Sequence, residues 1–330
     1  MTEPAPIRLM ASMPVPGVPT KLPVLSCPDV ILKRLDSSAG DPDLKKKLSP
    51  EQLATLHEFR LLISSHFTKV GDKTDPAPAD SEIADVRQDE ESWCDDACLL
   101  RYLRASNWKV SHAAERLEAT LKWRRSYKPH KITPDDVKTE SLTGKIYVNG
   151  FDIIGRPILY LCPKRENTKD YDQQLKHTVF VLETAIKMMP VGVEQMVIII
   201  DYEDVSMRTS PPLSISRRFL EVLGNHYPER FGIGFVVNPS WYLWVALTIV
   251  SPFLDPVSKA KLNFVSLDNK VKKKESTNDG TGTWTSLQKY IDNEMLDAMF
   301  GGAYMFEWDH PTYWSHICAL RNVRKRKIMM

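Results

Sequence analysis

Residues 227–267 read YPERFGIGFVVNPSWYLWVALTIVSPFLDPVSKAKLNFVSL, and this stretch decides the fold. The segment FVVN at 235–238 follows two glycines and precedes Pro239, and its apolar start is typical of a strand covered on both faces. A second strand is predicted at 262–267. Two strands joined by a helix predict a parallel βαβ unit.

The helix between these strands, at 241–250, is apolar on almost every side, and Thr248 alone indicates a polar face. It therefore lacks the amphipathic stripe of a surface helix. Its length is far below the roughly 20 residues that cross a bilayer. Three interpretations stay open for this helix: a core helix, a lid over an apolar cavity, or a helix at a membrane interface.

The composition describes a soluble globular protein of one large or two modest domains, with 330 residues, 42% hydrophobic and 26% charged. The net charge of +2 is too small to indicate a nucleic-acid partner. The start of the chain does not resemble a secretory signal, and five irregularly spaced cysteines do not form a disulfide framework. These features predict a reducing, cytoplasmic location.

Residues 1–50 are rich in proline without sustained periodicity, so we expect an extended arm. Residues 51–140 are predicted to form a helical N-terminal subdomain. Its first helix spans about 53–67, and two or three packed helices follow from Trp93 and end near Tyr127.

After Gly144 apolar strands alternate with helices, which predicts an α/β domain with a mostly parallel sheet over residues 141–305. An aromatic and basic tail, 306–330, follows. The strands are expected at 145–148, 157–161, 196–200, 234–238 and 262–267, and the helices at 171–189, 211–226, 241–253 and 285–299.

The sequence nominates no catalytic residue and no metal site. Cys98 and Arg104 have the spacing of a thiolate phosphatase, but the residues between them are strong helix formers that cannot cradle a phosphate. Cys94 and Cys98 lack a second pair to complete a zinc site. Because a nucleophile elbow, a P-loop and a dinucleotide fingerprint are also missing, we expect a protein that is not an enzyme.

Glu229 and Lys261 are the best candidates for ligand contact. Each precedes a strand of the predicted βαβ unit, so both are expected at the same edge of the sheet. The alternative is a plain ion pair or two solvated loop charges, since surface pairs are common and weak.

Several motifs together resemble the CRAL-TRIO lipid-binding family, and more narrowly the fungal phosphatidylinositol transfer proteins of the branch associated with azole resistance. The resemblance covers about residues 90–305. Single motifs are weak, but their order and spacing are specific. They are DDACLLRYLRASNWKVSHAAERLEATLKWRR (95–125), GRPILYL (155–161), IIID (198–201), HYPERFG (226–232), NPSWYLW (238–244), SPFLDPVSKAKL (251–262) and FGG (300–302).

This resemblance implies a helical bundle followed by an α/β domain whose sheet floors an apolar pocket for one phospholipid. It assigns the inositol headgroup contacts to Glu229, Ser258 and Lys261, with no cofactor besides the bound lipid. The apolar helix becomes a gate over the pocket, and its expected gate residues are Trp241, Trp244, Val245, Leu247, Thr248, Val250 and Phe253.

Departures from the family pattern narrow the range of ligands that we expect this chain to bind. The basic residue that follows the Leu-Arg-Ala motif in the family is Ser106 here. The small hydroxyl residues that meet a phosphatidylcholine headgroup correspond to Met196 and Ile198, which cannot replace those hydrogen bonds. We therefore expect phosphatidylinositol binding without phosphatidylcholine exchange, and a pocket floor that accepts a sterol or an azole as second ligand.

Delivery of a lipid predicts peripheral contact with a membrane, at the endoplasmic reticulum, lipid droplets or the cell periphery. Basic residues near an anionic leaflet and tryptophans at the interface would make this membrane contact. The alternative is that these residues form a solvated charged tail. The candidates are Lys270, Lys272, Lys273, Lys274, Arg321, Arg324, Lys325, Arg326 and Lys327, beside Trp308, Tyr313 and Trp314.

Two other functions remain as alternatives. One is a scaffold that senses a hydrophobe or presents it to a lipid kinase or a sterol-pathway enzyme without net transfer. The other is a lipid hydrolase, for which the sequence lacks a nucleophile motif.

Overall fold

The computed structural model describes residues 47–69, 80–205, 212–239, 243–244, 247, 256–267 and 283–327. Part of the predicted gate helix and of the predicted membrane contacts lies outside these residues. The gate residues concerned are Trp241, Val245, Thr248, Val250 and Phe253, and the basic residues concerned are Lys270, Lys272, Lys273 and Lys274.

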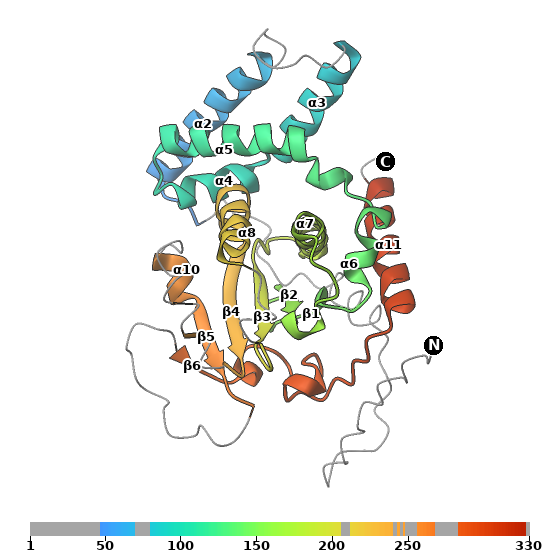
Figure 1. The fold of residues 1–330 in the computed structure, drawn as a ribbon. Coiled ribbons are helices and arrows are strands. Elements are labelled where there is room, and N and C mark those ends of the chain that lie inside the picture. The colour runs from blue at the N-terminus through green and yellow to red at the C-terminus, as the bar shows by residue number, and fades with distance from the viewer. Residues whose placement is uncertain are drawn as a thin grey trace.

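The N-terminal helices form a lobe at one end of the sheet (Figure 1). They are α2 (Pro50–Lys69), α3 (Asp80–Trp93), α4 (Asp96–Ala105) and α5 (Val110–Tyr127). Phe59, Leu103 and Leu117 are fully buried between them. The helical region predicted after Trp93 is confirmed, and α4 contains the whole segment from Cys98 to Arg104.

Helix α3 was not predicted, because its sequence DSEIADVRQDEESW has too few apolar residues for a helical stripe. Its contacts with α5 are ionic and aromatic. Arg125 Nε donates to Glu90 at 2.6 Å, and the Arg124 guanidinium lies 4.5 Å from the Trp93 ring centre. Charged side chains therefore attach this helix to the lobe. Contacts of this kind do not require apolar residues at helical spacing, so the sequence shows little helical periodicity.

The α/β part contains a six-stranded sheet in the order β1-β2-β3-β4-β5-β6, in which β1 is antiparallel to β2 and the other pairs are parallel. The predicted parallel pairing across the opening stretch is confirmed, whereas β6 was not predicted. The strands are β1 (Ile146–Phe151), β2 (Pro157–Leu161), β3 (Met196–Asp201), β4 (Phe231–Val237), β5 (Leu262–Val265) and β6 (Thr283–Trp284).

The connections between the parallel strands carry helices. They are α7 (Tyr171–Met188) between β2 and β3, α8 (Leu213–His226) between β3 and β4, and the short α10 (Pro256–Ala260) before β5. Between the lobe and β1 lie the turns η1 (Pro129–Lys131) and η2 (Asp135–Val137) and the short helix α6 (Lys138–Ser141); η3 (Pro163–Arg165) follows β2.

Two rows of side chains define one face of the sheet, because paired residues of neighbouring strands point the same way. We call this face the helix face, since α7 packs on its β1 end through Phe180 and Val181. The first row is Val148, Leu159, Ile198, Gly234 and Leu262, and the second is Ile146, Leu161, Ile200, Val236, Phe264 and Trp284.

The opposite face is covered by the segment after β6. Phe235 contacts Tyr290 with ring centres 5.0 Å apart, and Tyr160 contacts Phe300 at 5.4 Å. The helix predicted at 285–299 is wrong: the segment contains only the turns η6 (Leu287–Lys289) and η7 (Ala298–Phe300). Its apolar residues are spaced to follow the sheet surface rather than to form one helical stripe.

The C-terminal segment was expected as an aromatic and basic tail, but it forms the helix α11 (His310–Lys327) beside α7 (Figure 1). Arg321 is buried and donates to Ile132 O at 3.1 Å and Thr184 Oγ1 at 3.3 Å. Its expected role as an exposed or membrane-contacting charge is therefore wrong. The side chains of Arg324, Lys325, Arg326 and Lys327 lie outside the described residues.

The tail aromatics also face the core. Tyr313 is buried, donates to Val148 O at 3.0 Å and accepts from Val148 N at 3.0 Å, so its hydroxyl pairs the outer edge of β1. The Trp308 ring packs 4.6 Å from the Tyr313 ring, and Trp314 stacks on His310 at 5.4 Å. Tyr313 is therefore closed to a bilayer interface, whereas Trp308 and Trp314 are half-buried.

His177 in α7 is fully buried, and neither of its ring nitrogens has a hydrogen-bond partner among the described residues. Burial lowers its pKa to about 3, and the positive charges of Lys145 and His310 act in the same direction. An unfolded histidine titrates near pH 6.5, so the unfolded chain binds more protons between about pH 3 and 6.5. The contribution of the neutral His177 to the free energy of unfolding is therefore complete above pH 6.5, and it is lost as the pH drops below this value.

We expect the substitution His177→Leu to weaken this pH dependence, because it removes the imidazole that must stay neutral. The urea midpoint of the wild type should fall between pH 7.5 and pH 4.5 by more than that of the variant. The exposed His112→Leu serves as the matched control and should behave like the wild type. An equal fall of the urea midpoint in all three proteins would contradict the assignment of the pH dependence to His177.

Candidate functional site

The helix face is apolar but only partly covered where it leaves α7. Leu161, Ile198, Ile200 and Leu262 are half-buried there, whereas Leu159, Val236 and Phe264 of the same face are buried. On the opposite face most of the corresponding residues are sealed, with exposed fractions of 0 to 2% for Ile158, Tyr160, Val197, Ile199 and Phe235, while Ile233 is half-buried. One face of the sheet is thus ordinary core, and the other presents an apolar surface from β2 to β5.

The two predicted pocket-floor residues, Met196 and Ile198, both lie in β3 and point to the helix face. Met196 is buried and Ile198 is half-buried. The backbone approaches the surface closely at Gly234, where an added Cβ would lie 2.8 Å from Phe231 Cζ. The Phe231 ring therefore covers this glycine and limits the floor at the start of β4.

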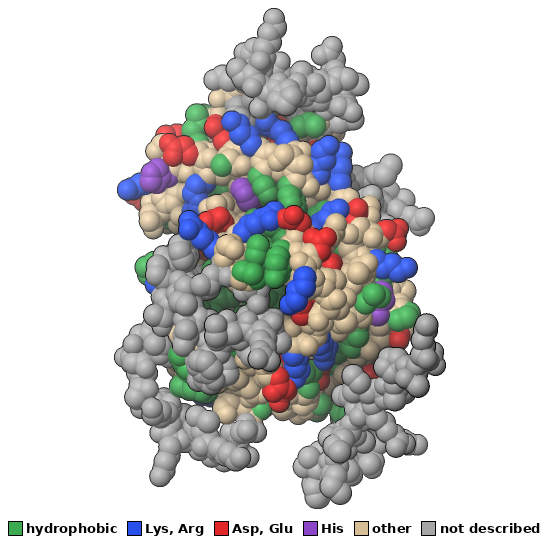
Figure 2. Space-filling model, in the orientation of Figure 1, with side chains coloured by type: hydrophobic (Ala, Val, Ile, Leu, Met, Phe, Trp, Pro, Cys, Tyr) green, Lys and Arg blue, Asp and Glu red, His purple; other side chains and the backbone are tan. Residues whose placement is uncertain are grey.

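Part of the predicted gate segment packs on the same face. Trp244 contacts Phe264 with ring centres 4.7 Å apart, and Leu247 packs against the same small cluster. Leu243, which was not selected from the sequence, is buried in it. Figure 2 shows apolar side chains gathered at the centre of the face drawn, bordered by basic and acidic ones.

The predicted headgroup residues lie where β4 and β5 begin. Glu229 precedes β4 by two residues and Lys261 directly precedes β5. Lys261 Nζ donates to Phe231 O at 2.9 Å, and Lys261 O accepts from Gly234 N at 2.9 Å. Lys261 is therefore fastened to the start of β4 through a neutral carbonyl, and among the described residues this bond uses one of its three N–H donors.

Ser258 lies in α10 and joins the same corner, since Lys261 N donates to Ser258 O at 3.2 Å. Glu229 has a left-handed backbone with φ of 59°, which is uncommon for a residue other than glycine. Its half-buried carboxylate makes no hydrogen bond or ion pair with the described residues. The structure thus brings the three residues to one edge of the sheet, and the ion pair considered as an alternative does not form among the described residues.

Sequence reasoning missed an arginine cluster beside this edge. Arg104 and Arg101 contact the Glu194 carboxylate at 2.6 and 3.3 Å, and Arg230 NH1 donates to Glu194 O at 2.8 Å. Burial lowers the pKa of Arg230 to about 10, so it remains a cation at neutral pH. Glu194 is about 90 residues from its partners in α4, and such a separation leaves no sequence pattern.

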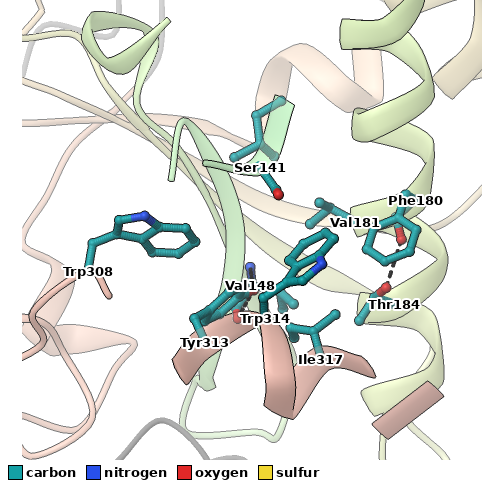
Figure 3. A pocket seen from close by; sticks show the side chains of 10 residues that line it. Ser141, Val148, Phe180, Val181, Thr184, Trp308, Tyr313, Trp314 and Ile317 are labelled. Carbon is teal, nitrogen blue, oxygen red and sulfur yellow. Dashed lines mark hydrogen bonds between the residues drawn. The ribbon is translucent and has the colours of Figure 1, made fainter. Parts of the chain in front are cut away.

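A small pocket lies away from this edge, between β1, α7 and α11 (Figure 3). It encloses at most about 230 Å³, which is below the roughly 300 to 1,000 Å³ of ordinary ligand pockets. Ser141 Oγ lies 2.8 Å from His310 Nε2 but donates its proton to Lys138 O at 2.7 Å. The imidazole must then donate to the serine, which is the reverse of the activation a serine nucleophile needs.

Metal binding and membrane spanning find no support within the described ranges. There, no cluster of three or more His, Cys, Asp and Glu side chains is arranged to hold a metal ion. Likewise, the helices of the described segments are too short or too polar to cross a bilayer.

Comparison with known proteins matches two parts of the chain to family models. Residues 142–302 match the CRAL/TRIO domain, and residues 45–119 match the CRAL/TRIO N-terminal domain. The first model covers the whole sheet and both strand starts that carry Glu229 and Lys261. The second covers most of the helical lobe.

Two relatives support the same family match. The chain is 37% identical over 76% of its length to a CRAL-TRIO domain-containing protein of Schizosaccharomyces pombe, covering 23% of that protein. It is 33% identical over 68% of its length to phosphatidylinositol transfer protein PDR17 of Saccharomyces cerevisiae, covering 62% of it. The chain therefore spans less than two thirds of these relatives.

A solved structure agrees at the level of the fold. The crystal structure of Sfh5 superposes with a TM-score of 0.57 over 86% of this chain and 99% of that one, at 14% identity.

We expect the substitution Ile198→Asn to weaken binding of an apolar probe to the helix face. An amide on that surface would lose hydrogen bonds to water when the probe covers it, at about 1 to 3 kcal/mol, which corresponds to roughly 5- to 150-fold in affinity. The measurement is fluorescence titration with a pyrene-labelled phospholipid. Ile153→Asn at the exposed β1–β2 turn is the matched control and should bind like the wild type, whereas equal affinity for all three proteins would exclude the helix face.

Proposed function

This chain belongs to the CRAL/TRIO family, and we propose that it binds one phosphatidylinositol molecule on the helix face and transfers it between membranes. The observation that carries the proposal is the contrast between the two ends of this face. An apolar, half-buried surface leads to a polar edge with Glu229, Ser258 and Lys261. A lipid has the same division between acyl chains and headgroup.

The chemistry of the polar edge fits an inositol phosphate. The Lys261 ammonium, which uses one donor among the described residues, can contact the phosphate with another, and Ser258 brings a hydroxyl to the same corner. The Glu229 carboxylate accepts hydrogen bonds from inositol hydroxyls. PDR17, a relative of this chain, is named a phosphatidylinositol transfer protein, which supports this choice of headgroup.

The floor of the face supports the rejection of phosphatidylcholine. Met196 and Ile198 offer no hydroxyl to a choline phosphate, so a buried headgroup would lose its hydrogen bonds to water without replacement. The same apolar side chains accept a sterol or an azole as second ligand, because these molecules require little beyond apolar contact.

Transfer requires binding energy and no covalent step. Burying an acyl chain contributes about 0.8 kcal/mol per CH₂, so the lipid stays bound in water and leaves only where a bilayer offers an equivalent environment. The gate helix would open at the membrane and close over a new lipid. Trp244 and Leu247, which pack on the helix face, are the gate residues whose contacts would have to break.

In this proposal the packed part of α11 does not contact the membrane. Arg321 and Tyr313 stabilise the core, so their release would expose buried polar and aromatic groups. We therefore place docking at the gate and the basic residues 270–274, with the protein peripheral on its membrane. A presenting role for a lipid kinase or sterol-pathway enzyme remains the second candidate and would show lipid binding without exchange between vesicles.

Lipids extracted from the purified protein should contain phosphatidylinositol and lack phosphatidylcholine. Mass spectrometry of the native protein and of its extract measures both the identity and the number of bound lipids, with one per chain expected. Phosphatidylcholine without phosphatidylinositol would refute the proposed selectivity.

The double substitution Glu229→Gln, Lys261→Met should lower phosphatidylinositol transfer between labelled vesicles by about 150-fold or more, because each charged contact contributes roughly 1.5 to 3 kcal/mol. Sterol binding should change little, and the thermal midpoint should fall only slightly, because Lys261→Met removes the hydrogen bond to Phe231 O. Glu221→Gln, Lys289→Met removes two exposed charges away from the edge and is the matched control. Unimpaired transfer by the first variant would overturn the headgroup assignment.

A further inference from the structure

The end of α8 is capped by helix α5 of the N-terminal lobe. Arg116 NH2 donates to Gly224 O at 3.1 Å while its NH1 donates to Ala105 O at 2.7 Å, and Thr120 Oγ1 donates to Asn225 O at 3.2 Å. The last carbonyls of a helix have no partner within it, so these donors satisfy groups that would otherwise face water. The lobe thereby holds the C-terminal end of α8 in place.

Thr120 is fully buried and reaches the next residue as well. Its Oγ1 lies 3.2 Å from His226 Nδ1. Because the hydroxyl proton is used on Asn225 O, the imidazole must donate through Nδ1. Trp123 stacks on the same imidazole, with ring centres 4.3 Å apart and planes 6° from parallel.

The following residue, Tyr227, is held from two sides. Its ring packs edge-on against Trp123 at 5.9 Å, and its hydroxyl donates to Glu183 Oε1 at 3.0 Å. Arg124 of α5 donates to the same carboxylate oxygen at 3.0 Å. One face of α5, with Thr120, Trp123 and Arg124, therefore contacts both residues that enter the α8–β4 turn.

The exit of the turn is tied to the lobe through α4. Arg230 donates to Glu194 O, and the Glu194 carboxylate is held by Arg101 and Arg104. The residue between entry and exit is Glu229, with its left-handed backbone. Such a conformation persists only where the surrounding structure determines it, and here the surroundings come from the helical lobe.

We propose that Thr120 and Trp123 are positioning residues for Glu229, so that the helical lobe sets how tightly the site holds a phosphatidylinositol headgroup. This inference rests on the proposed function, because it requires Glu229 to contact the lipid. Neither residue belongs to the rows that define the helix face. Both act by fixing the turn from which the carboxylate projects.

The test compares Thr120→Val, which keeps the shape and removes the donor, with Thr120→Ser, which keeps the donor. We expect Thr120→Val to lower phosphatidylinositol transfer about five- to tenfold, through a higher lipid concentration at half-maximal rate, and Thr120→Ser to stay within about twofold of the wild type. Lys122→Ala, at an exposed position of the same helix, is the matched control. Arg116→Met, which uncaps Gly224 O, provides a second variant should Thr120→Val fold poorly, and thermal unfolding monitors this.

Each substitution is then repeated in a Glu229→Gln background. If Thr120 acts through Glu229, Thr120→Val and Arg116→Met cause no further loss there, since coupled residues are not additive. Equal losses in both backgrounds would show a merely structural role and overturn the inference alone. Unchanged transfer by Glu229→Gln itself would overturn both the inference and the headgroup assignment.

Discussion

The sheet runs through its strands in chain order, and this order constrains what can lie on each face. Crossovers between parallel strands are nearly always right-handed, so successive crossovers in one direction fall on the same side. Helix α7 and the described residues around Trp244 indeed pack on one face. The other face is then left to the segment after β6, which seals it with rings such as Tyr290 and Phe300.

The same order explains the polar edge. Parallel strands all begin at one edge, so residues that precede β4 and β5 are brought together although a crossover separates them in the chain. Lys261 is fixed by two hydrogen bonds to β4, whereas Glu229 depends on the turn that holds it. The apolar surface and the charged corner are thus consequences of one topology, and both belong to the domain matched by the CRAL/TRIO model.

Buried charges connect the separate parts of the molecule. Glu194 joins α4 to the start of β4, and Arg321 joins α11 to α7 and to the segment after η1. A buried guanidinium is tolerated only when its donors are used, and Arg321 meets this condition through carbonyl and hydroxyl oxygens. A basic, aromatic C-terminal segment that reads as a tail is therefore a structural helix.

The sequence by itself determined the alternation of strands and helices, the parallel pairing of β4 with β5, and the edge at which Glu229 and Lys261 lie. These follow from local periodicity and from breakers such as Pro239, which act over a few residues. It did not predict α3, the irregular path of 285–299, or the burial of Arg321. Only the tertiary structure decided these, because their partners are distant in the chain: Glu90 pairs with Arg125, and Arg321 with Ile132 and Thr184.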